Sequence, residues 1–147
     1  MKILVSLFLL LLSCVSVQAV TMESLSNILV KTQIASTILL QGGFDIDCVT
    51  IDSLIYAGTY SETRTLCAGK IYKILGIGSD GITDLDITLF DENGIKVACD
   101  NNVDSVPEVI IIPFKTQIYK IKVLAYAVNI WTDEKNLFSL IISEKEL

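Results

Sequence analysis

The sequence contains no histidine and few basic residues, 11 against 17 acidic ones among its 147 positions. Without histidine there is no Ser-His-Asp triad, no Cys-His nucleophilic pair and no histidine-ligated zinc site. The net charge of −6 argues against a nucleic-acid-binding protein, because such proteins need clustered Lys and Arg to displace counterions from phosphates. The apolar content of 52% excludes a disordered chain, and the length is that of a single domain.

The first residues have the pattern of a secretory signal peptide. Lys2 precedes an apolar run at residues 3–12, and Val17-Gln18-Ala19 places small residues at positions −3 and −1 of a cleavage site. The run is shorter than the roughly 20 residues that span a bilayer. We therefore predict that residues 1–19 are a signal peptide and that the mature chain, starting at Val20, is secreted or periplasmic.

Two other fates of this segment are open. It could remain as an uncleaved N-terminal anchor. Alternatively, Leu11-Leu12-Ser13-Cys14 resembles a bacterial lipobox, in which Cys14 would be acylated and the protein would be held at a membrane through it.

Residues 20–43 are predicted to form one amphipathic helix and its connector. Leu25, Ile28 and Leu29 are followed at helical spacing by Ala35, Ile38 and Leu39. Gly42-Gly43 is expected to end the helix, because glycine accepts the left-handed conformation found at helix C-termini. Residues 37–40 taken alone also suit a strand.

Residues 44–147 are predicted to form a single domain, because their apolar pattern changes to a period of two. About eight short strands with turns at near-regular spacing predict an all-β, antiparallel sandwich. In residues 84–90, Leu85, Ile87 and Leu89 alternate with polar residues, and residues 91–94 are expected to form a hairpin turn. Later strands are expected at residues 109–112, short and buried, and at 117–128 and 137–142.

Several of these segments together resemble the bacterial pre-peptidase C-terminal domain. The matching residues are Leu66-x-Ala68-Gly69-x-x-Tyr72, Asp84-Leu85-Asp86-Ile87-x-Leu89-Phe90-Asp91-x-Asn93-Gly94, Val97-Ala98-x-Asp100, Pro113 and Tyr119-x-Ile121-x-Val123. The resemblance covers about residues 60–128. It implies a jelly-roll-like β-sandwich in a secreted protein, of a family whose members often accompany a secreted peptidase and assist secretion or substrate adhesion.

Acidic residues are concentrated in one part of the chain. Residues 80–108 contain eight acidic residues and a single base, Lys96. Hard oxygen ligands on loops at one end of a sandwich suit Ca²⁺, so Asp84, Asp86 and Asp100 are candidate calcium ligands. Solvated strand positions and turn formation explain the same aspartates without a metal. Two of these carboxylates could also form a hydrolase acid–base pair, which would require an enclosed cleft.

Three cysteines, Cys48, Cys67 and Cys99, follow the predicted signal peptide. In an oxidising compartment one disulfide would form and leave one thiol over. A Cys48–Cys67 bridge would close a loop of about 20 residues and contribute roughly 3 kcal/mol. The alternative is three small buried side chains in strands.

Three aromatic residues in the last 30 positions of the sequence are relevant to ligand binding. Tyr119, Tyr126 and Trp131 are expected in the core rather than on a ligand-binding face. We expect an exported, non-enzymatic accessory or interaction module with a protein or polysaccharide partner. The alternatives are a sugar- or peptide-binding module, which would need an aromatic-lined groove, and a small secreted hydrolase that uses the acidic cluster.

Overall fold

A computed structural model describes residues 22–129 and 136–147, and it shows one helix followed by eight strands. The elements are α2 (Met22–Gln41), β1 (Asp45–Leu54), β2 (Thr59–Leu66), β3 (Lys70–Gly78), β4 (Ile82–Phe90), β5 (Lys96–Asp100), β6 (Glu108–Ile111), β7 (Gln117–Val128) and β8 (Asn136–Glu146). The predicted all-β fold with an N-terminal helix is confirmed. In the part of the chain described, no helix is both long and apolar enough to cross a membrane.

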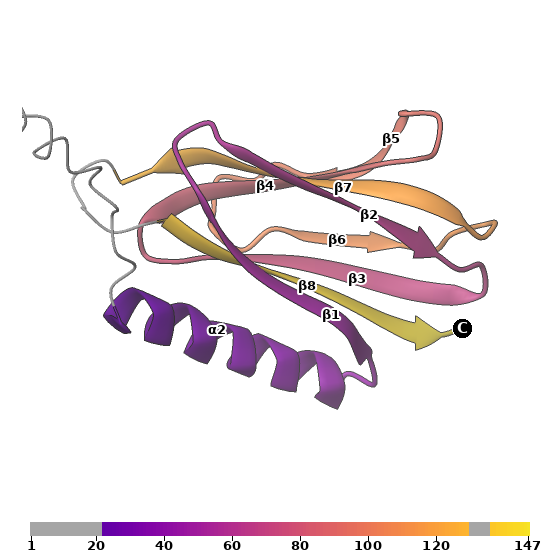
Figure 1. Cartoon of the computed structure of the whole chain (residues 1–147). Coiled ribbons are helices and arrows are strands. Elements are labelled where there is room, and N and C mark those ends of the chain that lie inside the picture. The colour runs from indigo at the N-terminus through magenta and orange to yellow at the C-terminus, as the bar shows by residue number, and fades with distance from the viewer. Residues whose placement is uncertain (1–21, 130–135) are drawn as a thin grey trace, which may run out of the picture.

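The strands form two antiparallel sheets that pack face to face (Figure 1). One sheet has the order β1-β8-β3-β6 and the other the order β2-β7-β4-β5. Successive strands β1 to β4 thus alternate between the sheets, and β5 to β8 return beside them in the pattern of a jelly roll. The jelly-roll-like sandwich that the resemblance implied is therefore the observed fold.

Helix α2 ends where the glycine pair predicts. Gly43 has a φ of 78°, in the left-handed region that favours glycine. The amides of Gly42 and Phe44 donate to the carbonyl oxygens of Ile38 and Leu39, at 3.0 Å each, and so satisfy the last turn. The alternative of a strand at residues 37–40 is wrong, because these residues continue the helix.

The main core lies between the two sheets. Leu85, Ile87 and Leu89 of β4 are completely buried, which confirms the predicted alternation of this strand. Strand β7 follows the same rule, with Ile121 and Val123 completely buried. A one-residue slip of either strand would expose this entire set, so the apolar alternation fixes the register.

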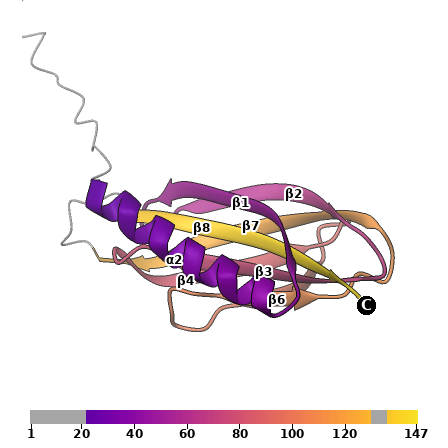
Figure 2. The ribbon, with the colours of Figure 1, turned by 90° about the horizontal axis from the view of Figure 1, so that it is seen from below.

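Helix α2 adds a third layer against the outer face of the β1-β8-β3-β6 sheet, and it runs across β8 (Figure 2). Ile28 and Leu39 of the helix pack with Ile77, Leu137 and Ile141. Strand β8 is therefore covered on both faces, by the helix and by the main core. This explains why its sequence is a nearly continuous apolar run rather than an alternating one.

Two burial predictions are wrong. Strand β6 is buried only on its inner face, where Val109 is 3% exposed, whereas Ile110 on the outer face is 53% exposed, because helix α2 packs mainly on β8, β1 and β3. Tyr119 is in the core as predicted, whereas Tyr126 is 62% exposed on β7. Trp131 lies outside the described residues.

Candidate functional site

The predicted calcium ligands lie near one another but are not arranged as a metal site. Asp84 and Asp86 are on β4, and the register places Asp100 of β5 opposite Ile87. Desolvation, followed by the charges of Asp84 and Asp100, raises the pKa of Asp86. Nevertheless, the described residues contain no group of three acidic or cysteine side chains placed to hold a metal ion.

The hydrogen bonds of Asp100 explain why its carboxylate is not placed as a metal ligand. Its Oδ1 accepts bonds from the backbone and side-chain amides of Asn102, and its Oδ2 accepts one from the backbone amide of Glu108 at 2.8 Å. Both oxygens are thus engaged in holding the loop between β5 and β6. Such an arrangement is the turn-forming role that aspartate takes without any metal.

Asp84 is not on the solvent-exposed face that the alternation predicts. Register irregularities on either side of Asp84 interrupt its pairing with β7, and the residue is only 6% exposed. Its Oδ1 accepts no hydrogen bond from the described residues. A buried carboxylate beside a carboxyl group with a raised pKa is one requirement of an acid–base pair. However, neither Asp84 nor Asp86 lines the lysine-lined hollow described below or the three other main hollows of the described surface.

The three cysteines do not form the predicted disulfide, since Cys48, Cys67 and Cys99 are all free. Cys48 is on β1, Cys67 directly follows β2, and Cys99 is on β5 at the far edge of the other sheet. Only Cys48 packs against the main core, and Cys99 is exposed. The alternative of three buried cysteines is therefore also wrong for Cys99.

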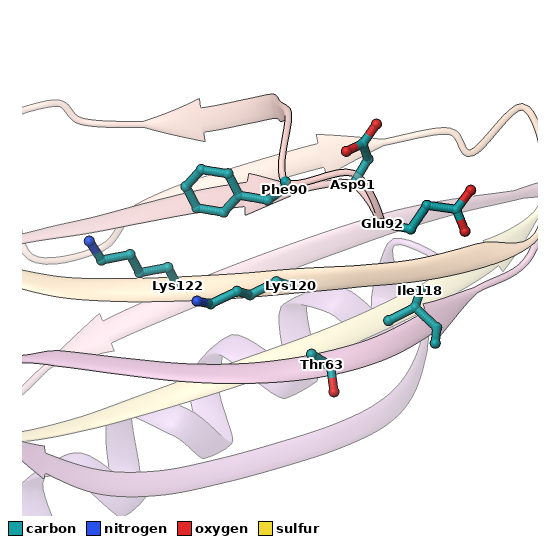
Figure 3. A pocket seen from close by; sticks show the side chains of 8 residues that line it. Thr63, Phe90, Asp91, Glu92, Ile118, Lys120 and Lys122 are labelled. Atoms are coloured by element: carbon teal, nitrogen blue, oxygen red, sulfur yellow. The ribbon is translucent and has the colours of Figure 1, made fainter.

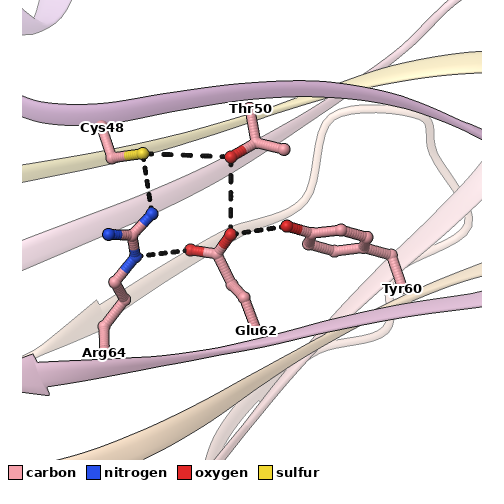
Figure 4. A network of polar contacts seen from close by, with 5 residues as sticks. All are labelled: Cys48, Thr50, Tyr60, Glu62 and Arg64. Atoms are coloured by element: carbon pink, nitrogen blue, oxygen red, sulfur yellow. Dashed lines mark hydrogen bonds and ion pairs between the residues drawn. The ribbon is translucent and has the colours of Figure 1, made fainter.

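Cys48 belongs instead to a polar seam, which we define as Cys48, Thr50, Tyr60, Glu62 and Arg64. The seam joins β1 to β2, the two edge strands on one side of the sandwich (Figure 4). At its centre Glu62 accepts hydrogen bonds from the hydroxyl of Tyr60 at 2.7 Å and from Nε of Arg64 at 2.8 Å.

The electrostatics of the seam follow from these contacts. Burial and the neighbouring Glu62 raise the pKa of Tyr60. The hydrogen bond to Glu62 also raises the pKa of Arg64, whose Nη2 lies 2.9 Å from Sγ of Cys48. Every polar group of Glu62 is thus engaged by a neighbour. The seam closes the open side of the sandwich, and it has the character of a structural bridge rather than a reactive centre.

A different surface offers room for a ligand. A hollow of about 480 Å³ lies over the outer face of the β2-β7-β4-β5 sheet, and we call it the lysine groove (Figure 3). Its lining residues come from three adjacent strands and the β4–β5 turn. They are Thr63, Phe90, Asp91, Glu92, Gly94, Ile118, Lys120 and Lys122.

The strand register explains how these side chains come together. Lys120 lies between Thr63 of β2 and Phe90 of β4, directly opposite both. Residues opposite each other in antiparallel strands project from the same face of the sheet. Ile118 and Lys122 share this face with Lys120, because each is two residues away along β7. The groove floor is therefore an apolar and cationic row along the central strand.

The two acidic residues of the groove have other partners. The carboxylate of Asp91 accepts hydrogen bonds from the amides of Asn93 and Ile95, and these bonds lower its pKa. Glu92 pairs with Lys115 at 2.6 Å. The ammonium groups of Lys120 and Lys122 point away from both carboxylates (Figure 3) and form no ion pair within the described part of the chain.

The lysine groove is not among the sites predicted from the sequence. The signal was present as Lys120-x-Lys122, two lysines on the polar side of a strongly alternating strand. Alternation alone predicts only that this side is solvated. It does not reveal that Phe90 and Thr63, distant in the sequence, flank the lysines.

Comparison with known proteins supports the fold. No family model matches the chain, and no curated protein matches it by sequence. Among solved structures, the pre-peptidase C-terminal domain of a collagenase from Bacillus anthracis is similar, with a TM-score of 0.50 and 17% sequence identity. The match covers 65% of this chain and 87% of that domain. The chain therefore has a fold like that of the pre-peptidase C-terminal domains.

Proposed function

We propose that this protein is an exported, non-catalytic module that binds a polymeric partner through the lysine groove. The observation that carries the proposal is the composition of this groove, in which Phe90 and Ile118 provide apolar surfaces beside the side chains of Lys120 and Lys122. Binding surfaces commonly combine aromatic contact area with a few placed charges. The likeness to the pre-peptidase C-terminal domain of a collagenase supports an accessory role beside a peptidase.

The location of the groove also supports binding rather than catalysis. It lies on the outer face of a sheet, and its two carboxylates are engaged by backbone amides and by Lys115. An acid–base pair needs a carboxyl group that is free to exchange a proton with the substrate. A surface of this type suits reversible adhesion to a chain longer than the groove.

Retention on polymers tests the binding function. The purified exported protein is sedimented with gelatin, chitin, cellulose, peptidoglycan and resin-bound poly-glutamate, and we expect retention on at least one of them. Phe90→Ala combined with Ile118→Ser should abolish that retention, because it removes the apolar surfaces. Val30→Ala combined with Ile34→Ser is the matched control, since both residues are exposed on α2, against the other sheet. Retention on none of the polymers, or equal loss in both variants, would overturn the proposal.

Export has a separate test. Intact-mass measurement of the exported protein should show Val20 as its first residue. A chain that begins at an acylated Cys14 would contradict this and would place the module on a membrane surface.

A further inference from the structure

We propose that the partner of the lysine groove is an acidic polypeptide segment in extended conformation, with carboxylates at alternate positions. This inference rests on the proposed binding function and specifies its ligand. It starts from two cations, Lys120 and Lys122, that face the groove and have no anionic partner in the described residues. Among the described basic residues, Lys96 and Lys145 also form no ion pair, but Lys120 and Lys122 are the two that lie side by side on one face of one strand.

The spacing of the two lysines favours an extended peptide. Alternate residues on one side of a strand are separated by about 6.8 Å. A second chain in the same extended conformation presents its own side chains at this same period. Carboxylates at positions i and i+2 of such a peptide would therefore face Lys120 and Lys122 simultaneously. On a helix the neighbouring side chains are instead three or four residues apart, about 5–6 Å.

The position of β7 within the sheet determines that its side chains, and not its backbone, contact the ligand. Strand β7 pairs with β2 on one side and with β4 on the other, so the ladders engage its backbone amides and carbonyls. The ligand cannot add to it as a further strand and must be held by side chains. The ammonium groups bind the carboxylates, while Phe90 and Ile118 cover the methylene groups of the ligand side chains. Affinity of this kind depends on salt.

The acidic end of the groove limits how the ligand lies. Asp91 and Glu92 remain at this end because the turn amides and Lys115 hold them. They would repel a further carboxylate of the ligand. The other acidic residues of segment 80–108 also repel the carboxylates of the ligand. An acidic peptide therefore finds its favourable position at the two lysines.

Fluorescence anisotropy with a labelled peptide of alternating Glu and Thr tests the inference. We expect binding at low salt that weakens at physiological salt. Lys120→Gln combined with Lys122→Gln should weaken it at least tenfold. Lys31→Gln combined with Lys145→Gln removes the same charge near α2, and this control should bind like the wild type. Circular dichroism confirms that both variants are folded.

Three comparisons would overturn the inference. The first is equal binding of a peptide with Gln in place of Glu. The second is equal binding of a peptide of the same composition in which all Glu residues are consecutive. The third is tighter binding of alginate, an anionic polysaccharide of matched charge. If any of these is found while Phe90→Ala with Ile118→Ser still abolishes polymer retention, the binding module stands and the acidic peptide is excluded. If that retention also fails, the proposed function falls with it.

Discussion

Two acidic residues of β4, the buried Asp84 and the half-buried Asp86, are removed from water in the folded protein. Asp84 is 6% exposed and its Oδ1 receives no hydrogen bond from the described residues. Desolvation and the charges of Asp84 and Asp100 raise the pKa of Asp86. Burying a carboxylate without a full set of hydrogen bonds costs free energy. Asp86 should therefore contribute to the pH dependence of stability, because its pKa is raised in the folded state.

Asp86→Asn tests this cost. Because the fold raises the pKa of Asp86, its contribution to stability is greatest below the unfolded-state pKa of about 3.9 and falls as the pH rises through the folded-state pKa. We expect the free energy of unfolding of Asp86→Asn to exceed that of the wild type at pH 7, with the difference vanishing near about pH 3. Urea unfolding at both pH values measures it. Asp47→Asn, on the exposed surface of β1, is the control, and a pH-independent difference for Asp86→Asn would contradict the prediction.

The same carboxylates decide the calcium question. Asp100 is engaged by Asn102 and Glu108, so we expect thermal unfolding in millimolar CaCl₂ and in MgCl₂ to show equal small shifts relative to EGTA. Shifts of this kind reflect charge screening. A rise in midpoint specific to calcium, lost when Asp84→Asn and Asp86→Asn are combined, would instead establish the predicted site.

Elements with strong local signals could be predicted from the sequence. Helix α2 ends at its glycine pair, and β4 and β7 follow their apolar alternation, because in each case the determining contacts repeat along the element itself. The exposure of Ile110 on β6 could not be predicted in this way, because it depends on which strands helix α2 covers on the outer face of the sheet. The lysine groove likewise depends on the register between three strands, which alternation within one strand does not specify.

Helix α2 is expected to contribute stability through one face only. Ile28 is completely buried against the β1-β8-β3-β6 sheet, whereas Ile34 is 56% exposed. Ile28→Ala should lower the free energy of unfolding by about 2–5 kcal/mol, as for other large-to-small core substitutions. Ile34→Ala should change it by less than about 0.5 kcal/mol. Equal effects in denaturant unfolding would mean that the helix does not pack on the sheet as described.

At the scale of the whole molecule, the two open sides of the sandwich are closed by different means. Strands β5 and β6 lie at the sheet edges on one side and contact each other. On the opposite side, β1 and β2 are joined by the polar seam, with Glu62 bound to both Tyr60 and Arg64. The polar seam differs from the apolar interior of a sandwich, because polar side chains fill the space where β1 and β2 face each other.

A double-mutant cycle on Glu62 and Arg64 measures what the seam contributes. The side chain of Glu62 is 12% exposed and that of Arg64 is 37% exposed, so removing either one leaves a partly desolvated partner. We expect Glu62→Leu alone to lower the free energy of unfolding by about 1–3 kcal/mol, because Arg64 and Tyr60 lose their acceptor. Arg64→Met added to Glu62→Leu should recover much of this loss, since apolar replacement of both partners of an ion pair is often neutral or stabilising.

The exposed pair of Glu92 and Lys115, treated in the same way, should show a coupling energy below about 1 kcal/mol. If the seam coupling were no larger than that of this surface pair, the seam would be an ordinary surface contact, and the packing of Tyr60 of β2 on Phe138 of β8 would remain as the contact between the two sheets on this side.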